Sequence, residues 1–224
     1  MWMDEEWEGI LVSDCHHSIK PLSSALFSHL PMKKSIIILL ALTSIMSLVA
    51  CSKVVMSDAT ESLLQNPLYA EQYWEDLVQQ MVNQQMSPNA AKDPAAKIVD
   101  AVRVDALAKA QAATTLRGQG MKGDFVGVTV QTQGTALLLK NALYFGPGFL
   151  SFPGPSLHVF LTGIVDPRDA AFPDPTGIDL GLIQTPYGAQ QYAIPTSANL
   201  AILRTAVLYD TQLKKVYGFA QLAK

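Results

Sequence analysis

The most apolar stretch of the chain lies early, in residues 32–50. Met32 is followed by two lysines, an apolar run over residues 35–48, and small residues directly before Cys51. A basic start, a short apolar core and small residues at the end are the layout of a secretory signal peptide. A permanent membrane span needs a longer segment with different flanks. We therefore expect a cleaved signal peptide over residues 32–50; a core helix or a membrane span that ends in cysteine is the alternative.

Residues 51–65 are polar and weakly patterned, which is typical of a tether. A helical pattern follows. Asn66 and Pro67 read as the N-cap and first residue of a helix that runs to about Met86 and is stopped by Ser87-Pro88. Its apolar positions recur on one side and include Leu68, Tyr73, Leu77, Met81 and Val82.

A second helical pattern begins at Asp93-Pro94 and ends near Gly118. Its apolar residues at helical spacing are Ile98, Val99, Val102, Ala106, Leu107 and Ala110. Residues 66–118 are therefore predicted to form a helical hairpin. The hairpin is either a packing spacer or an arm that binds a partner or dimerises.

After Gly118 the pattern changes to short runs of β-branched, aromatic and leucine residues separated by glycine and proline. Short strands at this spacing predict a mainly β domain over residues 119–224, an antiparallel β-sandwich. The expected strands cover residues 126–130, 135–139, 142–145, 157–161, 179–183, 190–194, 201–209 and 215–222. Residues 163–177 form a long loop rich in proline and aspartate.

Cysteine and histidine usage limits the chemistry. The stretch over residues 1–31 has no clear period and reads as an upstream extension with a mis-assigned start, the true start being Met32; a real cytoplasmic extension is the alternative. Without it, Cys51 and His158 are the remaining cysteine and histidine. This composition excludes an internal disulfide, a Cys/His zinc site, a thiol redox centre and a bis-histidine haem. With 16 basic and 19 acidic residues and no basic stripe, no nucleic-acid partner is expected.

The sequence Leu48-Val49-Ala50-Cys51 resembles the lipobox of a bacterial lipoprotein. The resemblance implies that the peptide is cut before Cys51, that this cysteine carries lipid, and that the protein is anchored to a membrane of the cell envelope. Ser52 follows the cysteine. An aspartate there would have resembled an inner-membrane retention signal, so the outer membrane, on its periplasmic face, is favoured if the organism is Gram-negative.

The C-terminal half resembles the DM13 family of extracytoplasmic β domains. The matching segments occur in order: GDF at 123–125, GTA at 134–136, LKN at 139–141, GPSLHVFL at 154–161, DLG at 179–181, GAQQYAIP at 188–195 and YGFAQL at 217–222. The resemblance implies a role in electron transfer, partly through a cysteine near the final strands. Asp210 stands at that position here. A carboxylate is a hard, redox-inert ligand, so the thiol route is closed to this chain.

His158 is the candidate ligand or base, and Asp210 or Tyr192 could complete a cofactor site for haem or a metal with it. The alternative is a hydrogen-bonded histidine in a sheet. Oxygen-rich loops can bind calcium, and Asp166, Asp169, Asp174 and Asp179 lie on or just after the proline-rich loop. Aromatic residues near turns form either an exposed patch or a cover for the core: Tyr144, Phe145, Phe149, Phe152 and Phe172.

No nucleophile elbow, P-loop or dinucleotide-binding motif occurs in the chain, so we do not expect an enzyme. The sequence favours an envelope lipoprotein whose DM13-like domain is a non-catalytic binding or structural module, with the membrane and an envelope protein as partners. The alternative is an electron-transfer or cofactor-binding protein.

Overall fold

The computed structural model describes residues 54–140 and 142–224. All of these residues belong to one compact unit, Ser52–Lys224. The expected signal peptide and Cys51 lie outside the described residues. Among the described residues, no helix has the length and apolar character that crossing a membrane requires.

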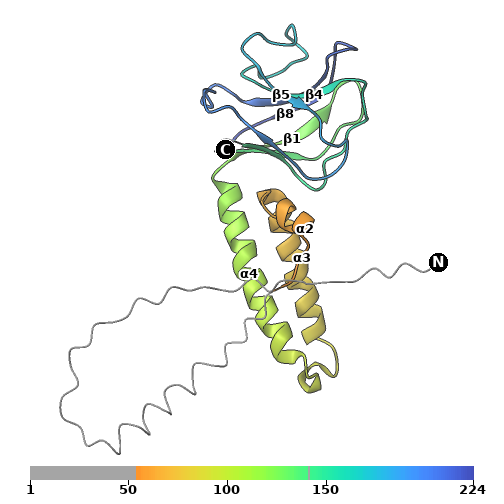
Figure 1. The fold of residues 1–224 in the computed structure, drawn as a ribbon, viewed down its shortest axis with the longest axis vertical. Helices are drawn as coiled ribbons and strands as arrows, with labels where there is room; N and C mark the ends of the chain where they lie inside the picture. Colours follow the sequence, from red (N-terminus) through yellow and green to blue (C-terminus); the bar gives the residue numbers. More distant parts are fainter. Residues whose placement is uncertain (1–53, 141) are drawn as a thin grey trace, which may run out of the picture. The chain divides into compact units, whose positions relative to one another are not determined.

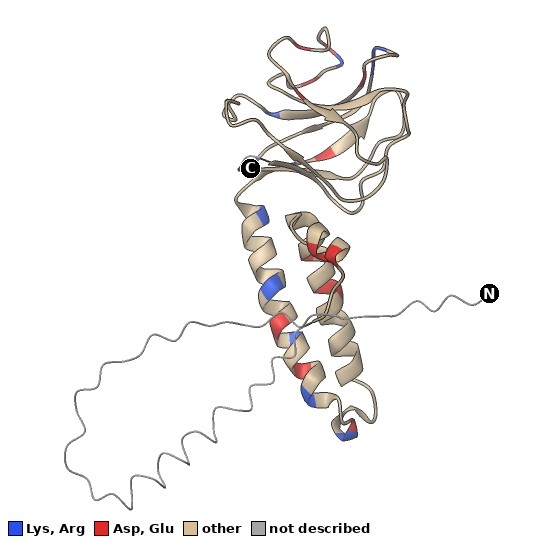
Figure 2. Ribbon diagram, viewed as in Figure 1, with Lys and Arg blue, Asp and Glu red and all other residues tan. Residues whose placement is uncertain are grey.

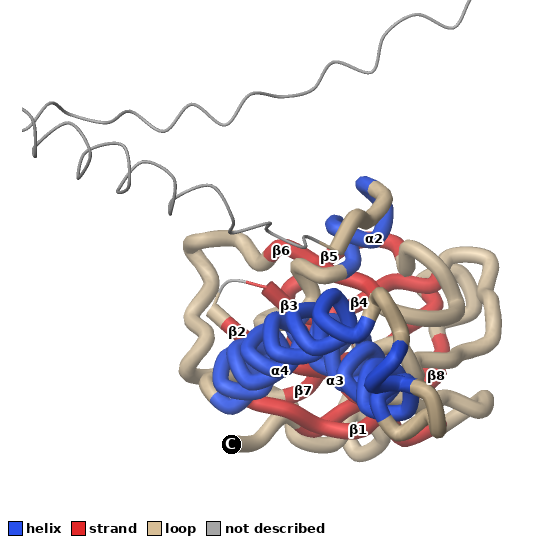
Figure 3. Tube along the Cα trace, turned by 90° about the horizontal axis from the view of Figure 1, so that it is seen from below, coloured by secondary structure: helices blue, strands red, loops and turns tan. Residues whose placement is uncertain are grey.

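Two long helices form the expected hairpin. They are α3 (Pro67–Gln85) and α4 (Ala96–Gly118), which lie side by side in two views at right angles (Figure 1, Figure 3). The short 3₁₀ helix η1 (Ala90–Lys92) lies in the connection between them. Asn66 caps α3 as predicted, because its side-chain oxygen accepts a hydrogen bond from the Leu68 amide at 3.0 Å.

The interface between α3 and α4 differs from the predicted one in α4. The residues that α4 buries are alanines, Ala106, Ala110 and Ala113, which pack with Ala70 and Trp74 of α3. Ile98 and Leu107, which were expected on the apolar face, are 57% and 41% exposed. Small side chains let the two helices approach closely, and the wide Trp74 fills the space that they leave.

Two boundaries also differ from the sequence prediction. The tether predicted over residues 51–65 contains the helix α2 (Asp58–Leu63), whose first turn is capped by Ser57. Leu64, just after it, packs against the hairpin core. The α4 helix starts two residues later than Pro94, because the Asp93 carboxylate accepts a hydrogen bond from the Ala95 amide and forms a turn before the helix.

The described strands form one antiparallel sheet of eight, in the order β5-β4-β7-β8-β1-β2-β3-β6. This confirms the predicted mainly β, sandwich-like fold, in which the sheet folds over until it is nearly closed. The strands are β1 (Met121–Gly127), β2 (Thr135–Leu139), β3 (Ala142–Phe145), β4 (Leu157–Thr162), β5 (Ile178–Leu182), β6 (Gln190–Ala193), β7 (Thr205–Asp210) and β8 (Lys215–Gln221).

The strand β1 begins five residues before the predicted run at 126–130. Phe125 is the residue that it buries in the core, whereas Val126 is 50% exposed. Val126 and Val128 alternate as a strand would, but on the side away from the core. The reason is that the partners β2 and β8 pair with β1 along residues 121–127, which sets the face of every side chain.

Both faces of the strands β4, β7 and β8 are buried. The inner face contributes Leu157, Val159 and Leu161 to the main core, as the alternation predicted. The outer face carries Phe160, Val207, Tyr209 and Phe219, and Phe172 from the loop over residues 163–177 packs onto them. The loop therefore covers the sheet, which explains why every residue of β7 is buried.

Asn66 also joins the hairpin to the sheet. Its side-chain amide donates hydrogen bonds to the Phe145 carbonyl at 2.7 Å and to the Gln190 carbonyl at 3.1 Å. Phe145 and Gln190 are partners in the β3–β6 pairing. One buried side chain thus caps α3 and attaches it to the end of two neighbouring strands.

Candidate functional site

Asp210 lies at the end of β7 and is fully buried. One carboxylate oxygen accepts hydrogen bonds from the Gln212 amide at 3.0 Å and the Leu213 amide at 2.8 Å. The other accepts from the Ser156 amide at 3.1 Å. The carboxylate therefore shapes the turn from β7 to β8 and attaches it to the residue before β4.

Two neighbours enclose the same carboxylate. Tyr217 lies close by, and burial, followed by the negative charge of Asp210, raises the pKa of its phenol. Gly154 packs so tightly against Asp210 that a Cβ atom at that position would overlap the carboxylate oxygen. Asp210 is thus closely surrounded by Tyr217 and Gly154, and backbone amides donate hydrogen bonds to both of its carboxylate oxygens.

His158 lies on β4 with its side chain on the outer face of the sheet. Its Nδ1 is 2.9 and 3.1 Å from the two carboxylate oxygens of Asp179 on β5. Asp179 also accepts a hydrogen bond from the Gly181 amide at 2.8 Å, which fixes the orientation of the carboxylate. The pair lies at the irregularity in the β4–β5 register. A histidine held in this way presents its Nε2 as the nitrogen for a ligand.

Tyr192 lies on β6 and is buried in the main core. Its hydroxyl donates to the Gln190 side-chain oxygen at 2.6 Å and accepts from the Gln184 amide at 3.1 Å. Burial raises the pKa of Tyr192 to about 12. The phenol is therefore a neutral, hydrogen-bonded part of the core.

The structure does not bring the three predicted ligands together. Asp210 pairs with Leu157 across the β4–β7 ladder and shares its inner side of the sheet. His158, one residue later, faces the outer side. Tyr192 lies in the main core, where Gln190 and Gln184 engage its hydroxyl. A haem or metal site built from all three residues does not fit this arrangement.

The acidic residues on and after the long loop have separate partners. Hydrogen bonds from the Arg168 side chain, and then from its backbone, lower the pKa of Asp166 to about 2. Asp174 accepts hydrogen bonds from Thr176 and Thr162, which lower its pKa, with the Thr176 side chain the largest cause. Within residues 54–140 and 142–224, no three His, Cys, Asp or Glu side chains are grouped to hold a metal ion. These aspartates therefore do not converge on one calcium site.

The aromatic residues near turns divide into two groups. Phe145 and Phe149 are buried in the core, and their rings pack at a tilt with a centroid separation of 4.7 Å, as the covering interpretation predicts. Phe172 covers the outer face. Phe152 is 53% exposed, and Tyr187, on the neighbouring segment, is 58% exposed. These two side chains are the surface aromatics of this end of the domain.

Residues 124–222 match the model of a known protein family, described as electron transfer DM13. The match includes His158, Asp179, Tyr192 and Asp210. These residues form a DM13 domain. The match includes the segments that carried the resemblance, from Asp124 to Leu222. Neither a search of curated proteins nor a search of solved structures gave a match.

The DM13 domain contains one pair that the sequence analysis missed, His158 with Asp179. The two residues are 21 positions apart and meet because β4 and β5 are neighbours in the sheet. Asp179, the first residue of an expected strand, was grouped instead with the aspartates on and just after the proline-rich loop as a calcium candidate. A period-two pattern shows which face a residue occupies, but it does not show which strand lies beside it.

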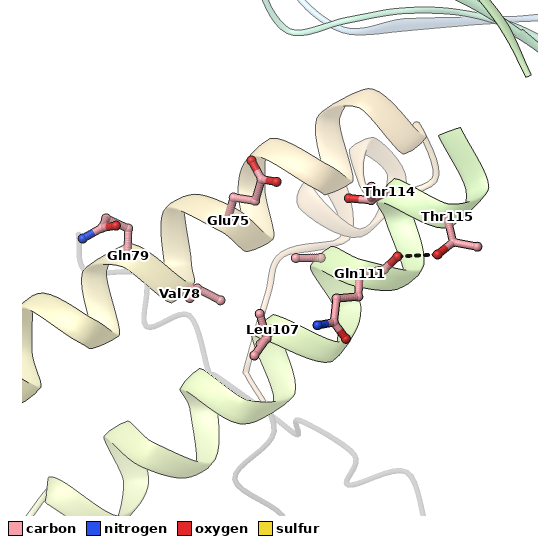
Figure 4. Close-up of a pocket in the computed structure, with 8 residues that line it drawn as sticks. Glu75, Val78, Gln79, Leu107, Gln111, Thr114 and Thr115 are labelled. Atoms are coloured by element: carbon pink, nitrogen blue, oxygen red, sulfur yellow. Dashed lines mark hydrogen bonds between the residues drawn. The ribbon is translucent and has the colours of Figure 1, made fainter. Parts of the chain in front are cut away.

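Before the DM13 domain, the hairpin carries an open groove that the sequence did not reveal. Both helices contribute residues to its lining, and the groove has a volume of about 380 Å³. Val78 and Leu107 lie on its two sides (Figure 4). The lining residues are Glu75, Val78, Gln79, Leu107, Ala110, Gln111, Thr114 and Thr115.

Proposed function

We propose that this protein is a lipoprotein of the cell envelope, anchored through Cys51, and that its DM13 domain is a non-catalytic binding or structural module. The anchor rests on residues 32–51 of the sequence, with their basic start, apolar core and lipobox-like end. The DM13 domain then lies outside the cytoplasm. An envelope protein is the partner expected for such a module.

The environment of Asp210 is the main support for the non-catalytic proposal. The position at which the DM13 resemblance expects a cysteine holds a carboxylate, and that carboxylate is fully buried and accepts three backbone hydrogen bonds. Thiol redox chemistry requires a thiolate that a reaction partner can reach. Asp210 provides neither the sulfur nor the access, and its hydrogen bonds give it a structural role.

The lipid anchor is tested by metabolic labelling with a tagged fatty acid in a bacterial host. The full chain should incorporate label and fractionate with membranes, and Cys51→Ala should lose both properties. Cys15→Ala, which changes the other cysteine of the chain, is the matched control and should keep both. Label that persists in Cys51→Ala would contradict the anchor.

A second candidate function is cofactor binding through His158, and the contact with Asp179 favours it. A carboxylate on Nδ1 fixes the tautomer of a histidine and directs Nε2 towards a ligand, as in many metal and haem proteins. The family description, electron transfer, agrees with such a role. In this second proposal, Asp179 orients the His158 side chain, which binds the cofactor. Asp210 and Tyr192 have structural roles only.

An ultraviolet–visible spectrum and elemental analysis of the purified full chain separate the two proposals. A colourless, metal-free, folded protein supports the non-catalytic module. A Soret or charge-transfer band, or stoichiometric metal, that disappears in His158→Ala supports the cofactor. A cofactor that survives His158→Ala would contradict both, and Gln191→Ala, an exposed change on β6, is the control for nonspecific loss.

A further inference from the structure

In the DM13 domain the lysines and arginines lie in loops and at the ends of strands (Figure 2). Lys122 lies at the start of β1, and Lys140 lies in the turn between β2 and β3. Because β1 and β2 are antiparallel, with Met121 opposite Leu138, both lysines lie at the same end of the sheet. Arg204 lies there too, since the segment after β8 pairs with it on one side and with Lys122 on the other. We call these three residues and the loop over residues 194–203 the basic end of the domain.

The charges of the basic end lack acidic partners. None of its three basic side chains takes part in an ion pair among the described residues. Acidic residues occur nearby on β1 and on the loop over residues 163–177, but that loop turns onto the outer face of the sheet. There Arg168 pairs with Asp166. The loop over residues 194–203 contains no acidic residue and lies between Lys140, beside its start, and Arg204, which follows it.

Apolar surface accompanies these charges. Ile202, in the loop over residues 194–203, is 53% exposed. A hollow of about 370 Å³ lies beside Lys140, and its other lining residues are Ile194, Pro195, Thr196, Ala198 and Leu200. The basic end thus combines positive charge at its edges with an exposed isoleucine and a largely apolar hollow. This is the combination by which a protein surface binds an anionic amphiphile.

The length of chain before the folded part limits where a membrane can lie. Met56 packs against the apolar cluster of the hairpin. Cys51 precedes it by five residues, and an extended chain spans at most about 3.6 Å per residue, so Cys51 lies within roughly 18 Å of Met56. A lipid on Cys51 therefore holds the folded part close to the bilayer, where one of its surfaces faces the headgroups.

From these observations we propose that the basic end docks on the anionic headgroups of the membrane that holds the lipid anchor. The inference rests on the anchor at Cys51 proposed above. Lys122, Lys140 and Arg204 attract the lipid phosphates, since each basic residue close to an anionic surface strengthens binding. Ile202 enters the interfacial layer, and the hollow beside Lys140 receives the apolar part of a lipid next to its phosphate. The docked domain has a fixed orientation, with the β7–β8 turn directed away from the bilayer.

Fluorescence quenching in vesicles tests the docked arrangement with the full-length chain. In a Cys15→Ser background, Ile202→Cys carries a fluorescent dye, and the processed protein is reconstituted into vesicles that contain lipid with a spin-labelled headgroup. Leu213→Cys is the matched control, because Leu213 is 49% exposed in the β7–β8 turn, at the other end of the sheet. In vesicles of two parts phosphatidylcholine to one part phosphatidylglycerol, quenching at position 202 should be several-fold stronger than at position 213. Equal quenching at the two positions would overturn the proposal.

Vesicles of phosphatidylcholine alone show whether lipid charge is responsible. Quenching at position 202 should fall towards that of the control in these vesicles, and also at high salt, which screens exposed charges. Strong quenching that is independent of phosphatidylglycerol would overturn the electrostatic docking. A protein that floats with the vesicles but keeps its dye unquenched would overturn the docking alone. A protein that does not float with either kind of vesicle would overturn the anchor as well.

Removal of one charge tests the basic end itself. Lys140→Gln, added to Ile202→Cys, should lower the ratio of docked to undocked protein roughly five-fold, the effect expected for one basic residue near an anionic surface. Lys214→Gln is the matched control. Both lysines are exposed and have the same left-handed backbone, with φ of 54° and 53°, so the two changes affect their turns alike. If Lys140→Gln lowers the ratio no more than Lys214→Gln does, the basic end is not the docking surface.

Discussion

At the scale of single residues, the buried carboxylate of Asp210 joins two segments of the sheet domain. A buried carboxylate is costly unless hydrogen bonds satisfy it. Here the Ser156, Gln212 and Leu213 amides do so. These donors belong to the turn after β7 and to the start of β4, so one side chain links two segments that are far apart in sequence.

Asp210→Ala should therefore cost stability. It leaves three amides without their acceptor in a site that excludes water, and we expect the free energy of unfolding to fall by about 2–4 kcal/mol. Urea denaturation followed by tyrosine fluorescence measures the change. Asp169→Ala, an exposed carboxylate of the same domain, is the control and should change stability little. A loss no greater than that of the control would show that the hydrogen bonds of Asp210 are not structural.

Gly154 gives a second prediction at this scale. A methyl group there overlaps the Asp210 carboxylate and comes within 2.9 Å of the Tyr217 hydroxyl oxygen. Gly154→Ala should lower the free energy of unfolding by about 1–3 kcal/mol, the usual cost of forcing atoms into a packed site. Gly148→Ala is the matched control, since its methyl group would meet no atom within 4 Å. If both variants melt at the same temperature, the packing around Asp210 is looser than described.

At the scale of elements, Asn66 holds the hairpin to the sheet. Its oxygen caps α3 and its amide group bonds to the Phe145 and Gln190 carbonyls. Asn66→Ala should lower the free energy of unfolding by about 2–3 kcal/mol, of which the cap accounts for about 1. Thermal melting followed by circular dichroism measures the change.

Asn66→Ser separates the two roles. Serine keeps a capping oxygen but cannot reach the strand carbonyls, so this variant should recover the cap and not the attachment. Ser57→Ala, which removes an exposed cap on α2, is the control for capping alone. If Asn66→Ser is as stable as the natural chain, the attachment to β3 and β6 contributes nothing.

The elements that the sequence predicted well are those set by local pattern. The strands β2, β3 and β4 begin at the predicted residue, because each carries a run of apolar residues that follows polar or turn-forming residues, with glycine or proline before β2 and β4. The cap at Asn66 and the end of α4 at Gly118 were predicted for the same reason. Local propensity was sufficient in these places.

Tertiary pairing decided the rest. The alanine face of α4 leaves Leu107 exposed because Trp74 already fills the space between the helices. The pairing of β1 with β2 and β8 sets which face each of its side chains occupies. The contact of His158 with Asp179 depends on the order of strands in the sheet. None of these is a property of a short window of sequence, so patterns alone could not supply them.

At the scale of the whole molecule, the buried tyrosines make stability depend on alkaline pH. Tyr192 has a pKa of about 12 in the folded protein, against about 10 for an exposed tyrosine. The folded state therefore holds its proton more tightly than the unfolded state does. The resulting stabilisation is complete below about pH 10 and is lost as the pH rises towards 12. Tyr217, whose pKa is also raised, acts in the same direction.

Between pH 9 and pH 12 we expect the free energy of unfolding to fall by about 2–3 kcal/mol on account of Tyr192, since each pKa unit corresponds to 1.36 kcal/mol. Urea midpoints at several pH values, with phenolate absorbance recorded in parallel, measure the fall. Tyr192→Phe is less stable at neutral pH because it loses the contacts with Gln190 and Gln184. Its stability should nevertheless decline less over this range, because phenylalanine has no proton to release. An equal decline in the two proteins would assign the alkaline sensitivity to other groups and would mean that Tyr192 ionises without unfolding the core around it.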